Sequence, residues 1–284
     1  MSDRLPVRKM FKLFIDGAFV RSESARSEPS AGANVARASR KDARDAVVAA
    51  RTAVTKWSGA TPALRGLVLY RLAEMMEARR AELAASLVTG GTDAKDAERE
   101  VTVAIDRVIW YAGWCDKYLA LASTRNPVGG PHFNFSTPEP TGVVAILAPD
   151  EPALVGLVSL VVPALVSGNA VVAVASEIDP CTAVVFSECV ATSDLPAGAF
   201  NLLTGTRAEL APGLAGHMDV IAFAAVDLER EFEVSLGVAA AENVKRTHFE
   251  HVGKRKLWLG ERFDDLERVL AFTELKTIWH PAKI

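Results

Sequence analysis

Cysteine is scarce in this chain of 284 residues, and its placement excludes two kinds of site. The three cysteines, Cys115, Cys181 and Cys189, are too few and too scattered for a disulfide framework. None lies in a C-x-x-C or His-flanked pattern, so we expect no metal site. This usage is typical of a reducing compartment, which predicts a cytoplasmic location.

The sequence also has no surplus of charge and no long apolar run. Its 32 basic and 35 acidic residues give a net charge of −3, so we expect no nucleic-acid partner. The longest apolar run, Ala153–Val166, is broken by a glycine, a serine and a proline. It is shorter than the roughly 20 residues of a membrane span, which predicts a buried helix and no membrane segment. Charges throughout the first residues argue against a signal peptide.

Apolar residues are abundant, at 50% of the chain, and this excludes intrinsic disorder. The length allows one large domain or two small ones. In the first part of the chain, Asp16-Gly17 within Phe11–Val20 predicts a β-hairpin, and the polar stretch Ser22–Pro29 predicts a loop. Apolar spacing and start signals then predict four helices, at Lys41–Lys56 (with Ser39 and Asp42 as its cap), from Thr61-Pro62 onward, at Ala81–Val88 and at Ala94–Leu121.

In the second half, short apolar runs of strand length alternate with helical patterns. Runs of this kind are typical of strands buried on both faces of a parallel sheet. The predicted strands lie within 143–149, 170–176, 200–203 and 219–223, and the predicted helices are 153–166, 182–192, 207–214 and 229–240. The alternation predicts an α/β fold, a helix-covered parallel sheet of the dinucleotide-binding type. Ligands of such sheets bind at the carboxyl ends of the strands, here 148–149, 176–177, 204–206 and 223–225.

Five stretches in this order resemble landmarks of the aldehyde dehydrogenase superfamily: FKLFIDGAFV, EPTGVVAILAP, PALVSGNAVVAVASEIDP, LPAGAFNLLTG and ENVKRTHFEHVGK. With the final ELKTIWHP, the chain looks like the shortened second unit of two-unit members. The resemblance implies a Rossmann-type sheet with an N-terminal helical layer and a protruding β-hairpin. It also implies that the catalytic domain is absent.

The family mechanism uses a cysteine nucleophile, an asparagine that holds the oxyanion, a glutamate base and NAD(P). By this resemblance, Glu151 replaces the asparagine, and Val174 replaces the lysine that contacts the cofactor ribose. Val226 replaces a serine beside the pyrophosphate, and Val252 replaces one of two glycines. Counting on from the glutamate, the cysteine position falls at or just past Ile284.

The resemblance also names candidate site residues. Glu250 matches the general base, but without a nearby nucleophile it has no catalytic task, which favours an exposed residue at a strand end. Glu177 could accept hydrogen bonds from the adenosine ribose, and Gly205 is either a turn glycine or a phosphate contact. Whether NAD or NADP still binds is open at this stage. The full set of candidate cofactor-binding residues is Ala148, Ser176, Glu177, Gly205 and Ala225.

We predict four segments. Residues 1–125 form a hairpin and helical layer, 126–146 an association hairpin with the first sheet strand, 147–260 the NAD(P)-binding-like sheet, and 261–284 a tail where the catalytic domain would begin. The first hypothesis is a non-catalytic subunit, in a homo-oligomer or a hetero-oligomer with a complete aldehyde dehydrogenase. The second is an NAD(P)-dependent aldehyde oxidoreductase that uses a cysteine of a partner chain, and a lesser third is a dinucleotide sensor.

Overall fold

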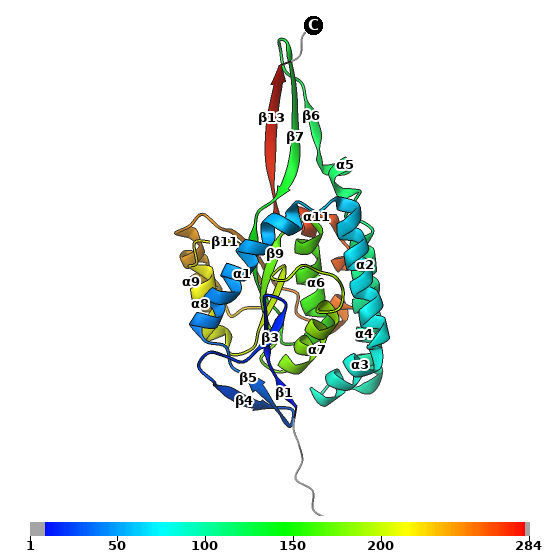
Figure 1. The fold of residues 1–284 in the computed structure, drawn as a ribbon, viewed down its shortest axis with the longest axis vertical. Coiled ribbons are helices and arrows are strands. Elements are labelled where there is room, and N and C mark those ends of the chain that lie inside the picture. The colour runs from blue at the N-terminus through cyan, green and yellow to red at the C-terminus, as the bar shows by residue number, and fades with distance from the viewer. Residues whose placement is uncertain (1–8, 282–284) are drawn as a thin grey trace, which may run out of the picture.

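A seven-stranded sheet forms the centre of the molecule in the computed structural model, which describes residues 9–281 (Figure 1). Its strand order is β12-β11-β8-β9-β10-β2-β3, and the five strands from β12 to β10 are parallel. The bounds are β2 Leu13–Ile15, β3 Ala18–Val20, β8 Val143–Leu147, β9 Ala170–Val174, β10 Phe200–Leu203, β11 Val220–Val226 and β12 Arg246–Glu250. The α/β fold with a Rossmann-type sheet is therefore confirmed.

The sheet is antiparallel at one edge, where the predicted hairpin joins the parallel strands. There β2 pairs with β10 and with β3 in antiparallel fashion. The reason is the tight turn at Asp16 and Gly17, whose φ angles of 52° and 74° suit a two-residue hairpin. A hairpin can join only antiparallel strands, so this edge cannot continue the parallel pattern.

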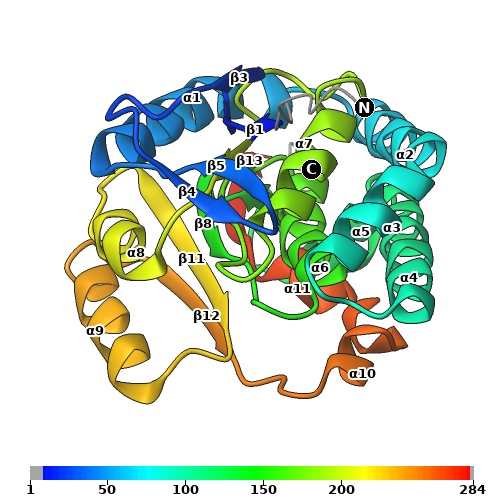
Figure 2. The same ribbon diagram turned by 90° about the horizontal axis from the view of Figure 1, so that it is seen from below.

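Helices cover both faces of the sheet, as Figure 2 shows. On one face lie α6 (Ala153–Val166) and α7 (Pro180–Val190), and on the other lie α1 (Arg40–Ser58), α8 (Arg207–Ala215) and α9 (Arg230–Ala241). Successive residues of β8 alternate between the two cores, with Val144 in one and Ala145 in the other. This burial on both faces explains the continuous apolar strands of the sequence.

The helical layer follows its predicted start signals. Ser39 caps α1 and Asp42 completes the capping box, while Thr61 caps α2 (Pro62–Ala78). Helix α3 spans Arg80–Thr89. The single helix predicted over Ala94–Leu121 is wrong, because α4 (Ala94–Ala112) ends at its cap residue Gly113 and a separate α5 (Tyr118–Ala122) follows.

A three-stranded arm projects from the body (Figure 1). It consists of β6 (Thr124–Asn126), β7 (His132–Pro140) and β13 (Thr273–Pro281), and β7 pairs with β13 along its whole length. Between β12 and β13 the chain forms α10 (Arg255–Trp258), a 3₁₀ turn (Glu261–Phe263) and α11 (Leu266–Leu270). The segment 261–281 thus returns to the arm.

The predicted loop at Ser22–Pro29 is partly wrong. Residues Ser27–Ser30 form β4, which pairs with β5 (Ala33–Ala36), and β5 pairs in turn with β1 (Met10–Phe11). The sequence predicted a loop because β4 is polar and lacks the apolar alternation of a strand. The strand forms because its backbone pairs with β5.

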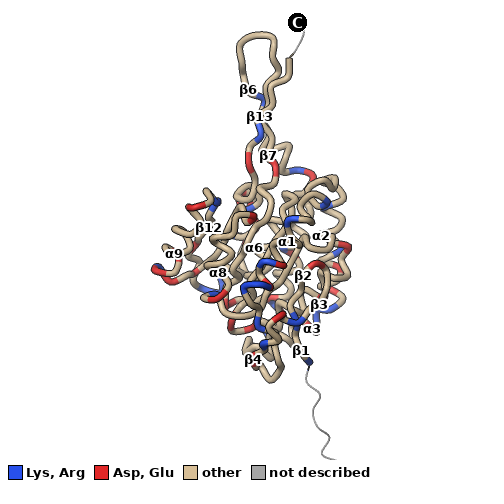
Figure 3. The backbone as a smooth tube through the Cα atoms, turned by 60° about the vertical axis from the view of Figure 1, so that its left-hand side comes forward, with Lys and Arg blue, Asp and Glu red and all other residues tan. Residues whose placement is uncertain are grey.

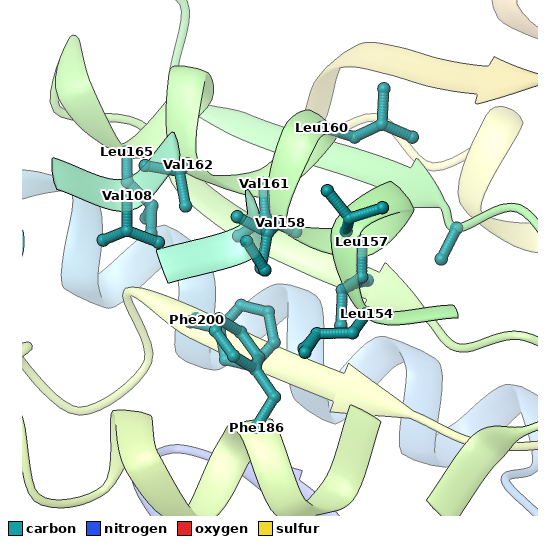
Figure 4. Packing of buried hydrophobic residues seen from close by; sticks show 14 of the residues in the cluster. Val108, Leu154, Leu157, Val158, Leu160, Val161, Val162, Leu165, Phe186 and Phe200 are labelled. Atoms are coloured by element: carbon teal, nitrogen blue, oxygen red, sulfur yellow. The ribbon is translucent and has the colours of Figure 1, made fainter. Parts of the chain in front are cut away.

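The apolar helix α6 packs at the centre of the larger core (Figure 4). Leu154, Leu157 and Val161 are fully buried, and the rings of Phe186 and Phe200 meet edge to face at 5.6 Å. Close packing is extreme at Gly156 in α6, where an added Cβ would lie 2.2 Å from Cγ of Pro149. The predicted buried helix is confirmed.

Within residues 9–281, no helix is both long and apolar enough to cross a membrane. The same range contains no group of three or more potential metal-ligating His, Cys, Asp or Glu residues. The expectations about the first residues and about Ile284 concern positions outside the described range.

Candidate functional site

The sheet has one topological switch point, between β8 and β11. From β8 the chain proceeds through α6 to β9 on one side, and from β10 it crosses through α8 to β11 on the other side. Open α/β sheets bind ligands in the crevice at the carboxyl ends of the strands on either side of such a point. The loops that follow β8 and β11, at 148–152 and 227–229, therefore flank the candidate site.

Arg207 joins the loops at this edge through a two-pronged ion pair. Its Nη1 and Nη2 donate to the two carboxylate oxygens of Asp150 at 2.8 and 2.7 Å, and Nη2 also donates to the Ala148 carbonyl at 2.7 Å. Glu177 completes the connection, because its amide donates to Asp150 at 2.8 Å and its carboxylate accepts from the Arg207 amide at 2.5 Å. A bidentate arginine–carboxylate pair is among the stronger polar contacts in proteins. Within residues 9–281, only Nε of Arg207 is left buried without a hydrogen-bond partner in this cluster.

The structure brings three of the five predicted cofactor residues to this cluster. Ala148 and Ser176 are buried, and Glu177 is exposed. The Ser176 hydroxyl donates to the Asp150 carbonyl at 3.0 Å and accepts from the amides of Ile178 and Asp179, so it closes a turn.

The other two predicted residues, Gly205 and Ala225, lie outside this cluster and have structural roles. Gly205 has a φ of +135°, and an added Cβ would lie 3.3 Å from the amide nitrogen of Ala38. It therefore serves as a turn glycine at a close backbone approach. Ala225 is buried in β11, opposite Leu147 of β8.

Both helix N-termini at the crevice face carboxylates of the protein itself. At α6, the amides of Leu154 and Val155 donate to the buried carboxylate of Glu100 at 2.8 and 3.1 Å. Glu100 also pairs with Arg255, and burial raises the pKa of its carboxyl. A helix N-terminus attracts anions, and here it already holds one.

The start of α9 is acidic. Glu229 is its N-cap residue and makes no capping bond, and Glu231 and Glu233 stand in the first turn. Val226, at the end of the preceding strand, is buried and offers no hydroxyl. A dinucleotide places its pyrophosphate at a helix N-terminus of this crevice. One N-terminus is therefore already satisfied by a carboxylate, and the other has acidic residues in its first turn beside Arg230, so neither favours a pyrophosphate.

Glu250, at the general-base position, is bound on both sides. Its carboxylate meets Nε2 of His248 at 2.6 Å and accepts from Arg268 Nη2 at 2.8 Å. The hydrogen bond with His248 and the pairing with Arg268 lower the pKa of Glu250 to about 2. A general base works best with a pKa near the working pH, so this carboxylate is a weak one. Glu250 does end β12, as expected, but its side chain is half-buried, at 19% exposed, rather than exposed.

All three cysteines are buried as free thiols. Burial raises the pKa of Cys115 to about 12, of Cys181 to about 11 and of Cys189 to about 12. The thiolate is the nucleophilic form, so these thiols are unreactive near neutral pH.

Sequence reasoning missed the partners that hold these groups. Arg207 carries a positive charge at the start of α8, where the helix dipole favours acids, and this mismatch was a signal for a nearby carboxylate. Arg268 and Glu100 gave no such signal, because their partners come from segments far away in the sequence.

Comparisons with known proteins agree with the fold. A family model described as "Aldehyde dehydrogenase family" matches residues 22–280. Aldehyde dehydrogenase family 2 member B4, mitochondrial, of Arabidopsis thaliana is 33% identical over 256 residues, which cover 86% of this chain and 47% of that protein. The cytosolic 10-formyltetrahydrofolate dehydrogenase of Xenopus laevis is 29% identical over 267 residues, covering 90% and 30%.

Two solved structures show the same relation. An NAD+ complex of aldehyde dehydrogenase from Bacillus cereus has a TM-score of 0.82 and 26% identity over 87% of this chain and 52% of that one. Aldehyde dehydrogenase C of Pseudomonas syringae, a mutant complexed with NAD+ and octanal, has a TM-score of 0.77 and 31% identity over 86% and 50%. The chain therefore spans about half the length of these relatives or less, and it belongs to the aldehyde dehydrogenase family.

Proposed function

We propose that this protein is a non-catalytic member of its family that acts as a structural or regulatory subunit. The observation that carries the proposal is the ion pair of Arg207 with Asp150 at the switch point. A cofactor that entered there would have to break a bidentate pair and displace Glu177 from the start of α8. Chemistry that needs a bound dinucleotide is therefore disfavoured.

The arm supports assembly as the working mode. Phe133, Leu275 and Trp279 are 39%, 66% and 59% exposed, and β13 and β6 are its outer strands. Lys, Arg, Asp and Glu are absent from residues 126–138 and 277–281, so the far part of the arm is uncharged (Figure 3). Uncharged edge strands with exposed aromatic side chains are typical of surfaces that pair with another chain. The occupant in this proposal is a second copy or a complete aldehyde dehydrogenase.

An active dehydrogenase is the second candidate. Its support is that Glu177 is exposed at the crevice and that Glu250 keeps the general-base position at the end of β12. In this case a partner chain supplies the cysteine, and NAD or NADP binds in the complex. We also keep a cytoplasmic location within the proposal, because the three cysteines are free thiols.

Mass photometry of the purified chain, alone and mixed with a complete aldehyde dehydrogenase, tests the assembly. We expect an oligomer that Trp279→Asp dissociates. Met218→Asp is the matched control, because Met218 is 78% exposed but lies on the body between α8 and β11. A native chain that stays monomeric, both alone and when mixed with the complete enzyme, would contradict the subunit proposal.

Calorimetric titration with NAD+ and NADP+ tests the cofactor crevice separately. We expect no saturable binding by the native chain. Octanal-dependent NADH formation by the purified chain alone would overturn the non-catalytic assignment. NADH formation that appears only in the mixed complex, and exceeds the activity of the complete enzyme, would favour the second candidate.

A further inference from the structure

A cavity of about 530 Å³ lies between α1 and α8, two helices that run side by side over one face of the sheet (Figure 2). Its lining residues come from the first turns of α1 and from the second half of α8 with the residues that follow it. They are Arg40, Ala43, Arg44, Leu210, Gly213, Leu214, Gly216 and His217. None of them belongs to the arm or to the loops at the switch point. The volume is within the usual range for small-molecule sites.

The wall from α1 carries two exposed arginines, Arg40 and Arg44, which have no acidic partner within residues 9–281. Arg40 and Arg44 are one helical turn apart and lie on the same face of α1. Within residues 9–281, no carboxylate oxygen lies within 4 Å of either guanidinium. The nearby acids are used elsewhere, since Asp219 pairs with Arg51 at 2.5 Å and Asp45 pairs with Lys41 at 3.6 Å.

The opposite wall adds a hydrogen-bond donor. Nδ1 of His217 accepts from the Asp219 amide at 3.2 Å, which leaves the ring hydrogen on Nε2. Burial lowers the pKa of His217 although the charge of Asp219 opposes the shift, so the imidazole is neutral near pH 7. The three cavity residues with polar side chains are therefore all hydrogen-bond donors.

The remaining lining is apolar or open. Ala43, Leu210 and Leu214 are buried members of the core beneath the cavity. Gly213 lies within α8, and an added Cβ there would meet no atom within 4 Å. The cavity thus combines guanidinium groups at one wall with an apolar floor.

We infer that this cavity binds a small carboxylic acid anion with a short apolar chain. The guanidinium groups of Arg40 and Arg44 match a carboxylate, because each presents paired donors in a planar fork. Ala43, Leu210 and Leu214 lie beneath the cavity and present no polar side chain to the chain of the ligand. This binding site is additional to the proposed subunit function and does not depend on it.

Isothermal titration calorimetry of the full chain with sodium hexanoate tests the inference. We expect saturable binding at one site per chain, little binding of 1-hexanol, and weaker binding of inorganic phosphate. Arg44→Gln weakens hexanoate binding about tenfold or more, because a charge-assisted hydrogen bond is lost. Gly213→Leu abolishes binding by filling the cavity.

Lys56→Gln is the matched control, because Lys56 lies on the same helix and is exposed but outside the cavity. Its affinity for hexanoate stays within twofold of the native value. Equal binding of 1-hexanol, equal binding of phosphate, unchanged affinity in Arg44→Gln, or no heat from the native chain would each overturn the inference. Circular dichroism spectra of the variants confirm that each one is folded.

Discussion

Replacing Glu250 by glutamine tests the ion-pair network at the end of β12 through its dependence on pH. In the native chain, the hydrogen bond from His248 and the pairing with Arg268 lower the pKa of Glu250 to about 2 from the ordinary 4.5. A group whose pKa is lowered by folding stabilises the folded state above its unfolded pKa. This stabilisation disappears as the pH falls from about 4.5 towards about 2.

The size of the effect follows from the shift. Each pKa unit corresponds to 1.36 kcal/mol, so the carboxylate contributes up to about 3 kcal/mol to the free energy of unfolding at pH 7. The Glu250 side chain is 19% exposed and that of Arg268 is 10% exposed, so solvent screens part of this energy. We expect a loss of about 2 kcal/mol in Glu250→Gln at pH 7.

Urea denaturation of both proteins at pH 7, 5, 4 and 3 measures the difference. The gap between the native chain and Glu250→Gln narrows as the pH falls below about 5, because the carboxylate becomes protonated and groups that do not contact Glu250 titrate alike in both chains. Glu231→Gln, an exposed acid of α9, is a control that leaves stability within about 0.5 kcal/mol. A gap that does not change with pH would refute the proposed cause.

Three further substitutions test other contacts. Arg207→Gln lowers the free energy of unfolding in urea by about 1 to 2 kcal/mol, since it removes the bidentate pair with Asp150, and an unchanged free energy would mean that the pair is not formed in solution. Tyr111→Phe lowers the melting temperature in calorimetry through loss of the 2.6 Å hydrogen bond to the Phe263 carbonyl, at a cost of about 1 kcal/mol, whereas equal melting would rule that bond out. Gly156→Ala costs about 1 to 3 kcal/mol by crowding Pro149 despite the better helix propensity of alanine, and a stabilised variant would refute that packing.

Local signals predicted most of the body of the fold. Apolar runs located β8 and β9, and capping residues such as Ser39 located the start of α1. These elements depend on neighbours in the sequence, so the pattern contains the information. A protruding hairpin at 126–146 was expected from the resemblance, but its third strand, β13, was not predicted, because it comes from a distant segment and pairs with β7 only in the folded chain.

The candidate site was predicted in position but not in its internal bonding. The rule for strand ends placed Ala148, Ser176 and Glu177 at one edge. No local pattern in the sequence predicts the ion pair of Arg207 with Asp150 or that of Arg268 with Glu250. Such pairings depend on the three-dimensional fold. The domain boundaries and the assembly partner stay predictions.

The pairing of β7 with β13 also delays completion of the arm during synthesis. Strand β7 emerges from the ribosome about 130 residues before its partner, which at roughly 5 to 20 residues per second is a delay on the order of ten seconds. During that time the arm has one unpaired edge, including the aromatic Phe133 and Phe135. The nascent chain therefore exposes an unpaired, aggregation-prone edge of β7 until β13 is available. We expect chaperones to bind the chain mainly in this interval.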